Sequence, residues 1–124
     1  MKLFTVQEAN DLLPLVKDDL TTIRSLYVRL ALYREDAQAA ANVSSKGGGM
    51  PGGSVYVKAL YEIGKLTTEL SDMGVQLKDH DRGLIDFPSL RDGRIVLLCW
   101  QLGEDDEIEW WHELDAGFSG RQRL

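Results

Sequence analysis

Apolar residues recur every three or four positions through the first third of the chain, which is the spacing of one helix face. Thr5 and Glu8 have the spacing of a capping box, so we expect the helix to begin at Val6. We expect one long helix within residues 1–42 that ends between Asp36 and Asn42. It would be about 45 Å long, longer than a domain of this size is wide. The apolar series is Val6, Ala9, Leu13, Val16, Leu20, Ile23, Tyr27 and Leu30.

Proline at position 14 interrupts this series, because it lacks a backbone donor and crowds the preceding turn. Either a kink at Pro14 or a short leading helix followed by a restart is expected. Residues 43–53 are rich in glycine and are interpreted as the tip of a helical hairpin. A second helix over residues 54–74 follows, with Gly74 placed as a left-handed cap. Its apolar stripe is Ala59, Ile63, Leu66, Leu70 and Met73.

The apolar period changes from helical to alternating after Gly74, which predicts strands. Residues 84–90, 94–102 and 107–114 form three candidate strands, and the alternation around Val75 and Leu77 suggests a fourth. Asp92-Gly93 is the sequence of a two-residue hairpin, and Pro88 favours an edge position for its strand. The sequence thus predicts a single α+β domain over residues 1–124: a long antiparallel helical hairpin, then a small antiparallel β-meander of three or four strands with a tail over residues 75–124.

The middle candidate strand is apolar on both faces, because Val96, Leu98 and Trp100 alternate with other apolar residues. One helical hairpin covers one face of a sheet. We therefore predict that Val96, Leu98, Trp100 and Trp111 lie at an interface with a second copy of the chain. The oversized first helix supports the same expectation of a homodimer or higher oligomer.

Charge and composition narrow the class of protein. The 124 residues carry a net charge of −6, and residues 79–124 hold eleven acidic and five basic side chains. An acidic surface argues against non-specific nucleic-acid binding. The sequence shows no apolar stretch long enough for a signal peptide or a membrane span, so we expect a cytoplasmic protein. Its single cysteine, Cys99, is interpreted as a buried small apolar residue in a reducing compartment.

Two groups of acidic and imidazole side chains are candidates for chemistry. One surrounds Asp81 and Asp86, and the other comprises His112, Glu113 and Asp115. In a three-stranded meander the groups lie about 10 Å apart across the middle strand, so long side chains or a partner would have to join them. If they meet, Asp86, His112 and Glu113 could hold a divalent metal such as Mn²⁺, Zn²⁺ or Mg²⁺.

Structural roles compete with this interpretation. His112 shares its face with apolar neighbours, which favours a hydrogen-bonded core histidine. Asp86 lies between Ile85 and Phe87 in an apolar strand, and a buried carboxylate needs a partner. Arg82, Arg94 or Arg121 could supply the partner without any catalysis.

Several short runs of residues match the pattern of a known family: Phe4-Thr5, Glu8-Ala9-Asn10, Leu12-Leu13-Pro14, Lys78-Asp79, Asp81, Gly83-Leu84, Asp86-Phe87-Pro88, Leu98-Cys99-Trp100, Leu102-Gly103-Glu104, Trp111-His112-Glu113, Gly117-Phe118 and Gly120-Arg121. At these positions the chain resembles a bacterial family known as domain of unknown function 2203. The resemblance implies the domain boundaries and a bacterial origin, and the family name implies no activity.

Two hypotheses for function follow. The first is a small cytoplasmic oligomer that serves assembly or binds a protein partner. The alternative is a metal-binding or hydrolytic enzyme that uses Asp81, Asp86, His112 and Glu113, with Arg121 holding an anionic substrate. A carboxylate of Asp81 or Asp86 within about 5 Å of the His112 ring, in an open cleft, would favour the enzyme.

Overall fold

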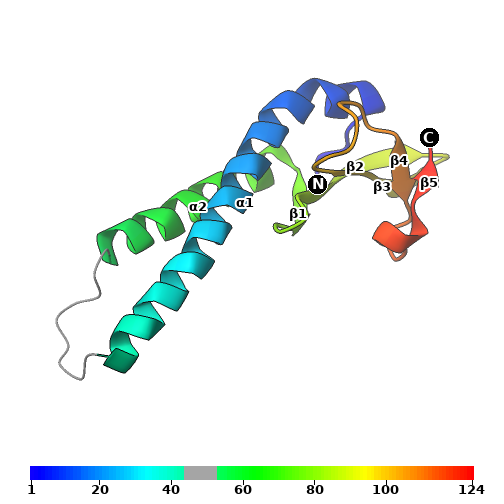
Figure 1. Cartoon of the computed structure of the whole chain (residues 1–124). Helices are drawn as coiled ribbons and strands as arrows, with labels where there is room; N and C mark the ends of the chain where they lie inside the picture. Colours follow the sequence, from blue (N-terminus) through cyan, green and yellow to red (C-terminus); the bar gives the residue numbers. More distant parts are fainter. Residues whose placement is uncertain (44–52) are drawn as a thin grey trace.

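Two helices and a five-stranded antiparallel sheet make up the part of the chain that the computed structural model describes, residues 1–43 and 53–124, with side chains outside 36–43 (Figure 1). The strands follow one another across the sheet in chain order, and the short 3₁₀ helix η1 (Phe118–Gly120) precedes the last. The elements are α1 (Val6–Val43), α2 (Gly53–Met73), β1 (Gln76–Asp79), β2 (Leu84–Arg91), β3 (Arg94–Gln101), β4 (Trp110–His112) and β5 (Gln122–Arg123).

The predicted α+β class, the helical hairpin and the β-meander are confirmed, with five strands in place of three or four. Most of the predicted glycine-rich loop, residues 44–52, lies outside the described residues. No helix in the described parts of the chain has the length and apolar character that crossing a membrane would require.

The capping box at the start of α1 is confirmed. The Glu8 N–H donates to Thr5 Oγ1 at 3.0 Å, and the Thr5 N–H donates to Glu8 Oε1 at 2.9 Å, so two free donors of the first turn are satisfied. The helix continues through Pro14 without a restart, and its dark-blue first turns are inclined to the rest (Figure 1). Six of the eight residues in the predicted apolar series are buried: Ala9, Leu13, Val16, Leu20, Ile23 and Leu30.

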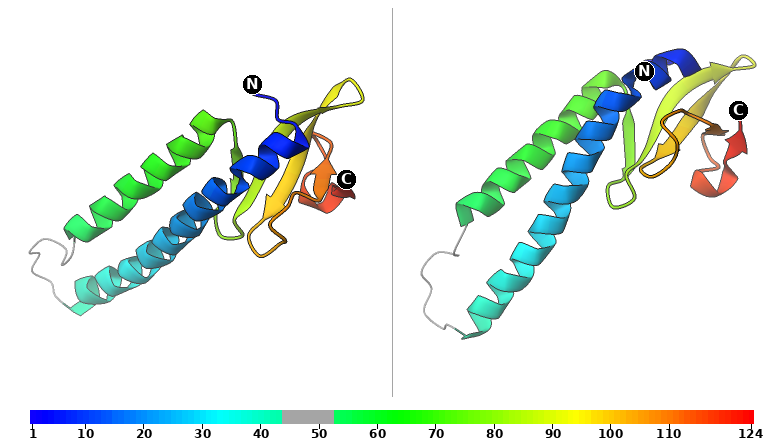
Figure 2. Two further views of the ribbon diagram at one scale, coloured as in Figure 1. Left: turned by 90° about the horizontal axis from the view of Figure 1, so that it is seen from above. Right: turned by 45° about the horizontal axis from the view of Figure 1, so that its top comes forward.

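The second helix also packs as predicted. Ala59, Ile63, Leu66 and Leu70 are buried against α1, and the left-handed φ of +92° at Gly74 ends the helix. The N-terminal part of α1 lies along the sheet, whereas the remainder of the hairpin projects away from it (Figure 2). Contacts from α1 to the loop between β3 and β4 fix this placement, because the Ile108 N–H donates to Asn10 Oδ1 at 2.7 Å.

The turn between β2 and β3 sets the register of the sheet. Asp92 and Gly93 both have positive φ, 52° and 78°, as the two-residue hairpin requires. Arg91 therefore pairs with Arg94, and each residue further from the turn has a fixed partner. The expectation that Pro88 places its strand at the edge is wrong, because β1 pairs with the first half of β2. Pro88 itself lies beyond β1, where its carbonyl accepts the Phe4 N–H at 2.7 Å.

The apolar face predicted to be exposed is instead the face that α1 covers. Val96, Leu98, Trp100 and Trp111 are each at most 6% exposed and belong to one cluster with the buried residues of α1, α2 and the N-terminal segment. The premise of the predicted interface was therefore wrong, since these four side chains need no second copy to bury them. The reason is that α1 extends over the sheet before it enters the hairpin (Figure 2).

One buried carboxylate lies between the two helices. Asp19 on α1 is 8% exposed, and its Oδ2 has no hydrogen-bond donor among the described residues. Burial raises the pKa of Asp19, and the nearby Glu69 carboxylate on α2 raises this pKa further. Two carboxyl groups can form a hydrogen bond with each other only when one of them is protonated. The Asp19–Glu69 contact is therefore more favourable in acidic than in neutral solution.

Replacing Asp19 with Asn should stabilise the protein at neutral pH. A raised folded-state pKa means that the contribution of Asp19 to stability is complete below its unfolded pKa and is lost as pH rises through the folded value. Asp19→Asn should therefore increase the free energy of unfolding at pH 7 by about 1 kcal/mol, with a smaller gain or a loss at pH 4. Urea unfolding at both pH values measures the difference.

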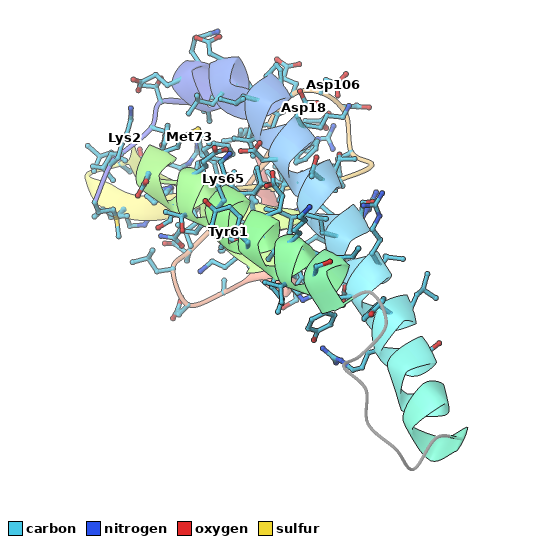
Figure 3. The ribbon with its side chains drawn as sticks, turned by 90° about the vertical axis from the view of Figure 1, so that its left-hand side faces the viewer. Lys2, Asp18, Tyr61, Lys65, Met73 and Asp106 are labelled. Carbon is cyan, nitrogen blue, oxygen red and sulfur yellow. The ribbon has the colours of Figure 1, made fainter. Side chains whose placement is uncertain are left out.

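The neighbouring Asp18 provides the control. It is exposed on α1 and lies near Asp106 (Figure 3). Asp18→Asn should change stability at pH 7 much less than Asp19→Asn does, because the charge of Asp18 is only the smallest contribution to the raised pKa of Asp19. A gain from Asp19→Asn that does not depend on pH would contradict the shared-proton interpretation.

Candidate metal centre

Three side chains that can bind metals meet on the sheet face opposite α1. Asp86 on β2 pairs with Cys99 on β3 across the hairpin, and His112 on β4 pairs with Leu97, two residues from Cys99 on the same face. One ligand atom from each lies within 4.8 Å of the other two. We call Asp86, Cys99 and His112 the ligand trio; among the described residues it is the one such group of three or more.

The contacts of His112 indicate which of its two ring nitrogens carries a proton. Its Nδ1 lies 2.7 Å from the Glu113 carbonyl oxygen, and a carbonyl can only accept, so Nδ1 carries a proton. Its Nε2 lies 3.2 Å from both carboxylate oxygens of Asp86. In a neutral ring protonated at Nδ1, the Nε2 lone pair would face those oxygens. The contact is therefore favourable when Nε2 also carries a proton, when Asp86 is protonated, or when a cation lies between the two groups.

The ligand trio is secluded from solvent. Asp86 and His112 are 2% exposed and Cys99 is fully buried. Burial, followed by the charge of Asp86 and a hydrogen bond to its carboxylate, raises the pKa of the Cys99 thiol to about 12. Without a metal the sulfur is therefore a neutral thiol, which is neither a reactive nucleophile nor a ligand.

Arg121 lies over Trp110, the cross-strand partner of Cys99 in the ligand trio. Its side chain is 8% exposed, donates to Glu104 and stacks on the rings of Trp110 and Phe118, 4.7 and 4.6 Å from their centroids. Its positive charge lowers the pKa of Cys99, against the effects of Asp86 and Glu104. The Gln101 N–H holds the other oxygen of Glu104 at 2.7 Å. This Arg–Glu pair is part of the polar surroundings of the sulfur.

Two of the predicted site residues do not join the ligand trio. The Asp81 side chain is 81% exposed and lies 3.1 Å from His80. The Glu113 carboxylate forms an ion pair with Arg94, which lowers its pKa, and only the Glu113 backbone carbonyl contacts His112. Glu113 therefore supports the histidine through its backbone and is not placed as a metal ligand by its side chain. The partner of Asp86 is His112, and not one of the arginines that could have supplied it.

The two groups of residues that were expected to lie about 10 Å apart do meet, through Asp86 and His112. Cys99 lies between them on β3, and its short side chain leaves room for the imidazole ring to reach β2. The distance part of the criterion for an enzyme is satisfied at 3.2 Å, whereas the requirement for an open cleft is not, because all three side chains are buried.

Cys99 is the functional candidate that sequence reasoning missed. The signal for it was present in the hairpin: counting six residues back from Asp92 and six forward from Gly93 places Asp86 opposite Cys99. Cross-strand partners share a face, so the carboxylate and the thiol had to be neighbours once that turn was assigned.

The fold and the ligand trio define an α+β protein with a secluded Asp-Cys-His cluster on one sheet face. Comparison with known protein families matches residues 2–124 to the uncharacterized conserved protein family DUF2203, and the chain belongs to that family. The family resemblance noted in the sequence is thus confirmed. No curated protein and no solved structure matches the chain.

Truncating His112 should strongly destabilise the metal-free protein. His112→Ala leaves the Asp86 carboxylate buried without its partner, which typically costs about 3–5 kcal/mol. His80→Ala is the matched control, because His80 is partly exposed and stacks on Tyr27. Denaturant unfolding in a chelator measures both, and the control should lose less than about 1 kcal/mol.

A double variant tests the coupling between the two groups. If Asp86 and His112 satisfy each other, His112→Ala with Asp86→Ala should cost clearly less than the sum of the two single losses. Additive losses would show that the pair is not the source of the effect.

Proposed function

We propose that this protein binds a zinc ion through Asp86, Cys99 and His112. The observation that carries the proposal is the orientation of His112. Its Nδ1–H is committed to a backbone carbonyl, which leaves Nε2 directed at the Asp86 carboxylate with Cys99 beside them. A histidine that binds a metal through one nitrogen ordinarily donates its other N–H to a carbonyl or carboxylate in this way.

The donor set favours zinc over the magnesium and manganese considered from the sequence. Thiolate and imidazole ligands suit Zn²⁺, whereas Mg²⁺ and Mn²⁺ prefer oxygen. Tetrahedral zinc separates its nitrogen and oxygen ligands by about 3.4 Å, close to the 3.2 Å between Nε2 and the Asp86 oxygens. Tetrahedral zinc separates sulfur from nitrogen or oxygen by about 3.5 Å, so the sulfur has to approach by no more than about 1.3 Å, because the widest separation in the trio is within 4.8 Å.

Charge balance supports the same ion. One carboxylate, one thiolate and one neutral imidazole carry two negative charges, which a divalent cation neutralises inside the protein. Three protein ligands leave a fourth coordination position, the arrangement of catalytic zinc sites. The ligands are buried, however, so a hydrolytic reaction would need movement of the surrounding segment. Metal binding is therefore the function proposed, and hydrolysis is not part of it.

Purified protein loaded with zinc chloride and then desalted should retain about one zinc ion per chain. His112→Ala should retain none, because it removes the ring that links the ligand trio. The affinity should rise with pH, since binding requires loss of the Cys99 proton, whose pKa is about 12. Elemental analysis gives the stoichiometry, and competition with a chromophoric chelator at two pH values gives the affinity.

His80→Ala controls for adventitious binding through histidine, because His80 lies on the turn between β1 and β2 and outside the trio. This variant should bind zinc as the wild type does. Equal zinc retention in wild type and His112→Ala, or none in either, would refute the proposed site.

Assembly is a second candidate function, supported by the projecting hairpin and not by the sheet. A groove of about 580 Å³ lies between the helices, lined by Leu26, Leu30, Tyr33 and Tyr56 among others. Leu32 and Val55 at this groove are more than half exposed, as is Tyr61 on α2 (Figure 3). Exposed apolar side chains that gather on the helical hairpin favour association, and a second copy of the chain is the partner we propose.

Light scattering at micromolar concentration tests assembly. The wild type should give a multiple of 13.9 kDa, and Leu32→Lys combined with Val55→Lys should reduce it to the monomer mass. Leu90→Lys is the control, because Leu90 is equally exposed on β2 outside the groove. A wild-type monomer would contradict the proposal.

A cytoplasmic location and a bacterial origin complete the proposal. A reducing compartment keeps the single cysteine available as a metal ligand. The acidic C-terminal third argues against a nucleic-acid partner. A protein partner would bind the same exposed apolar surface of the helical hairpin that we propose for assembly.

A further inference from the structure

Any ion that reaches the ligand trio must pass the side chains that cover it. The three ligands are at most 2% exposed. Arg121, whose side chain is 8% exposed and pairs with Glu104, lies over the ring of Trp110, the cross-strand partner of Cys99. We propose that Arg121 and Glu104 form a gate that controls access of solutes to Cys99 and, resting on the proposed function, the exchange of zinc. Arg121 is thus a positioning residue in this account and not a ligand.

Contacts on three sides hold Arg121 in place. Its planar group stacks on Trp110, which is the cross-strand partner of Cys99, and on Phe118 of η1. It also donates to Glu104 in the loop after β3. Arg121 therefore links the C-terminal segment to that loop across the face that carries the sulfur. Breaking the Arg121–Glu104 pair would separate the two segments at this position.

The C-terminal segment can open without unfolding the rest of the protein. η1 has no buried residue, and the two exposed residues of β5 pair only with β4 within the described sheet. The large apolar cluster is on the opposite sheet face and includes no residue after Trp111. Segments with few buried apolar contacts open locally at free energies far below that of global unfolding.

Arg123 is a matched control for Arg121. It also stacks on Trp110, at 5.0 Å from the ring centroid, and also pairs with a glutamate, Glu109. Its side chain is 67% exposed, compared with 8% for Arg121. The two residues thus differ chiefly in how far their side chains are buried.

The gate can be tested without metal, because Cys99 is the only cysteine and reports its own accessibility. The metal-free protein is mixed with a thiol reagent such as Ellman's reagent, and the rate of reaction is followed. Arg121→Gln and Glu104→Gln should each increase the rate at least about tenfold, while Arg123→Gln should leave it within about twofold of the wild type. An unchanged rate in Arg121→Gln, or an equal increase in Arg123→Gln, would overturn the gate.

A second measurement separates gating from loss of stability. The reaction rate is repeated at low urea concentrations, where local opening depends weakly on urea and global unfolding depends strongly. The gate predicts a nearly flat dependence in Arg121→Gln. A slope equal to that of global unfolding would overturn the gate, because the thiol would then react only in the unfolded chain.

Zinc exchange gives the complementary readout. Arg121→Gln should speed both zinc uptake and zinc release, measured with a chelator in stopped flow, and should change the equilibrium affinity by less than about threefold. If zinc does not bind while the thiol rates respond as expected, the proposed function fails and the gate stands. If zinc binds and neither rate changes in Arg121→Gln, the gate fails and the zinc site stands.

Discussion

The buried contact between the His112 ring and the Asp86 carboxylate is the interaction on which the polar half of this structure depends. It joins β2 to β4 across the intervening β3, where Cys99 lies between the two groups. A carboxylate at this depth is tolerated only with a compensating charge. Because the backbone carbonyl of Glu113 fixes the ring tautomer, a second proton, a proton on Asp86 or a metal cation must provide the compensation. The same geometry thus suits both a metal-free state and the proposed zinc site.

The two faces of β3 divide the molecule into an apolar side and a polar side. On one face, Val96, Leu98 and Trp100 pack beneath α1 and form the large core. On the other, Cys99 belongs to the ligand trio, with Arg121 of the C-terminal segment nearby. The first face is held by apolar burial shared among many side chains, whereas the second depends on a few charged groups. We therefore expect the second face to be the more responsive to pH, metal and substitution.

Local signals in the sequence predicted most of the elements. The capping box at Thr5 and Glu8, the α2 stripe and the Asp92-Gly93 turn all act between near neighbours and were assigned correctly. The allocation of sheet faces was wrong, because it depends on where α1 lies, and no local pattern records that position. Asp86 and His112 were identified as candidates, but their convergence depends on the short side chain of Cys99. Cys99 itself was missed because a lone buried cysteine usually has no role beyond packing.

X-ray absorption at the zinc edge tests the central claim most directly, since it reports the atoms bound to the ion. The zinc-loaded protein should show one sulfur ligand at about 2.3 Å together with nitrogen and oxygen ligands at about 2.0–2.2 Å. Because the chain contains a single cysteine, that sulfur signal would identify Cys99 as the cysteine ligand. A spectrum with only nitrogen and oxygen ligands would place the zinc elsewhere and contradict the account.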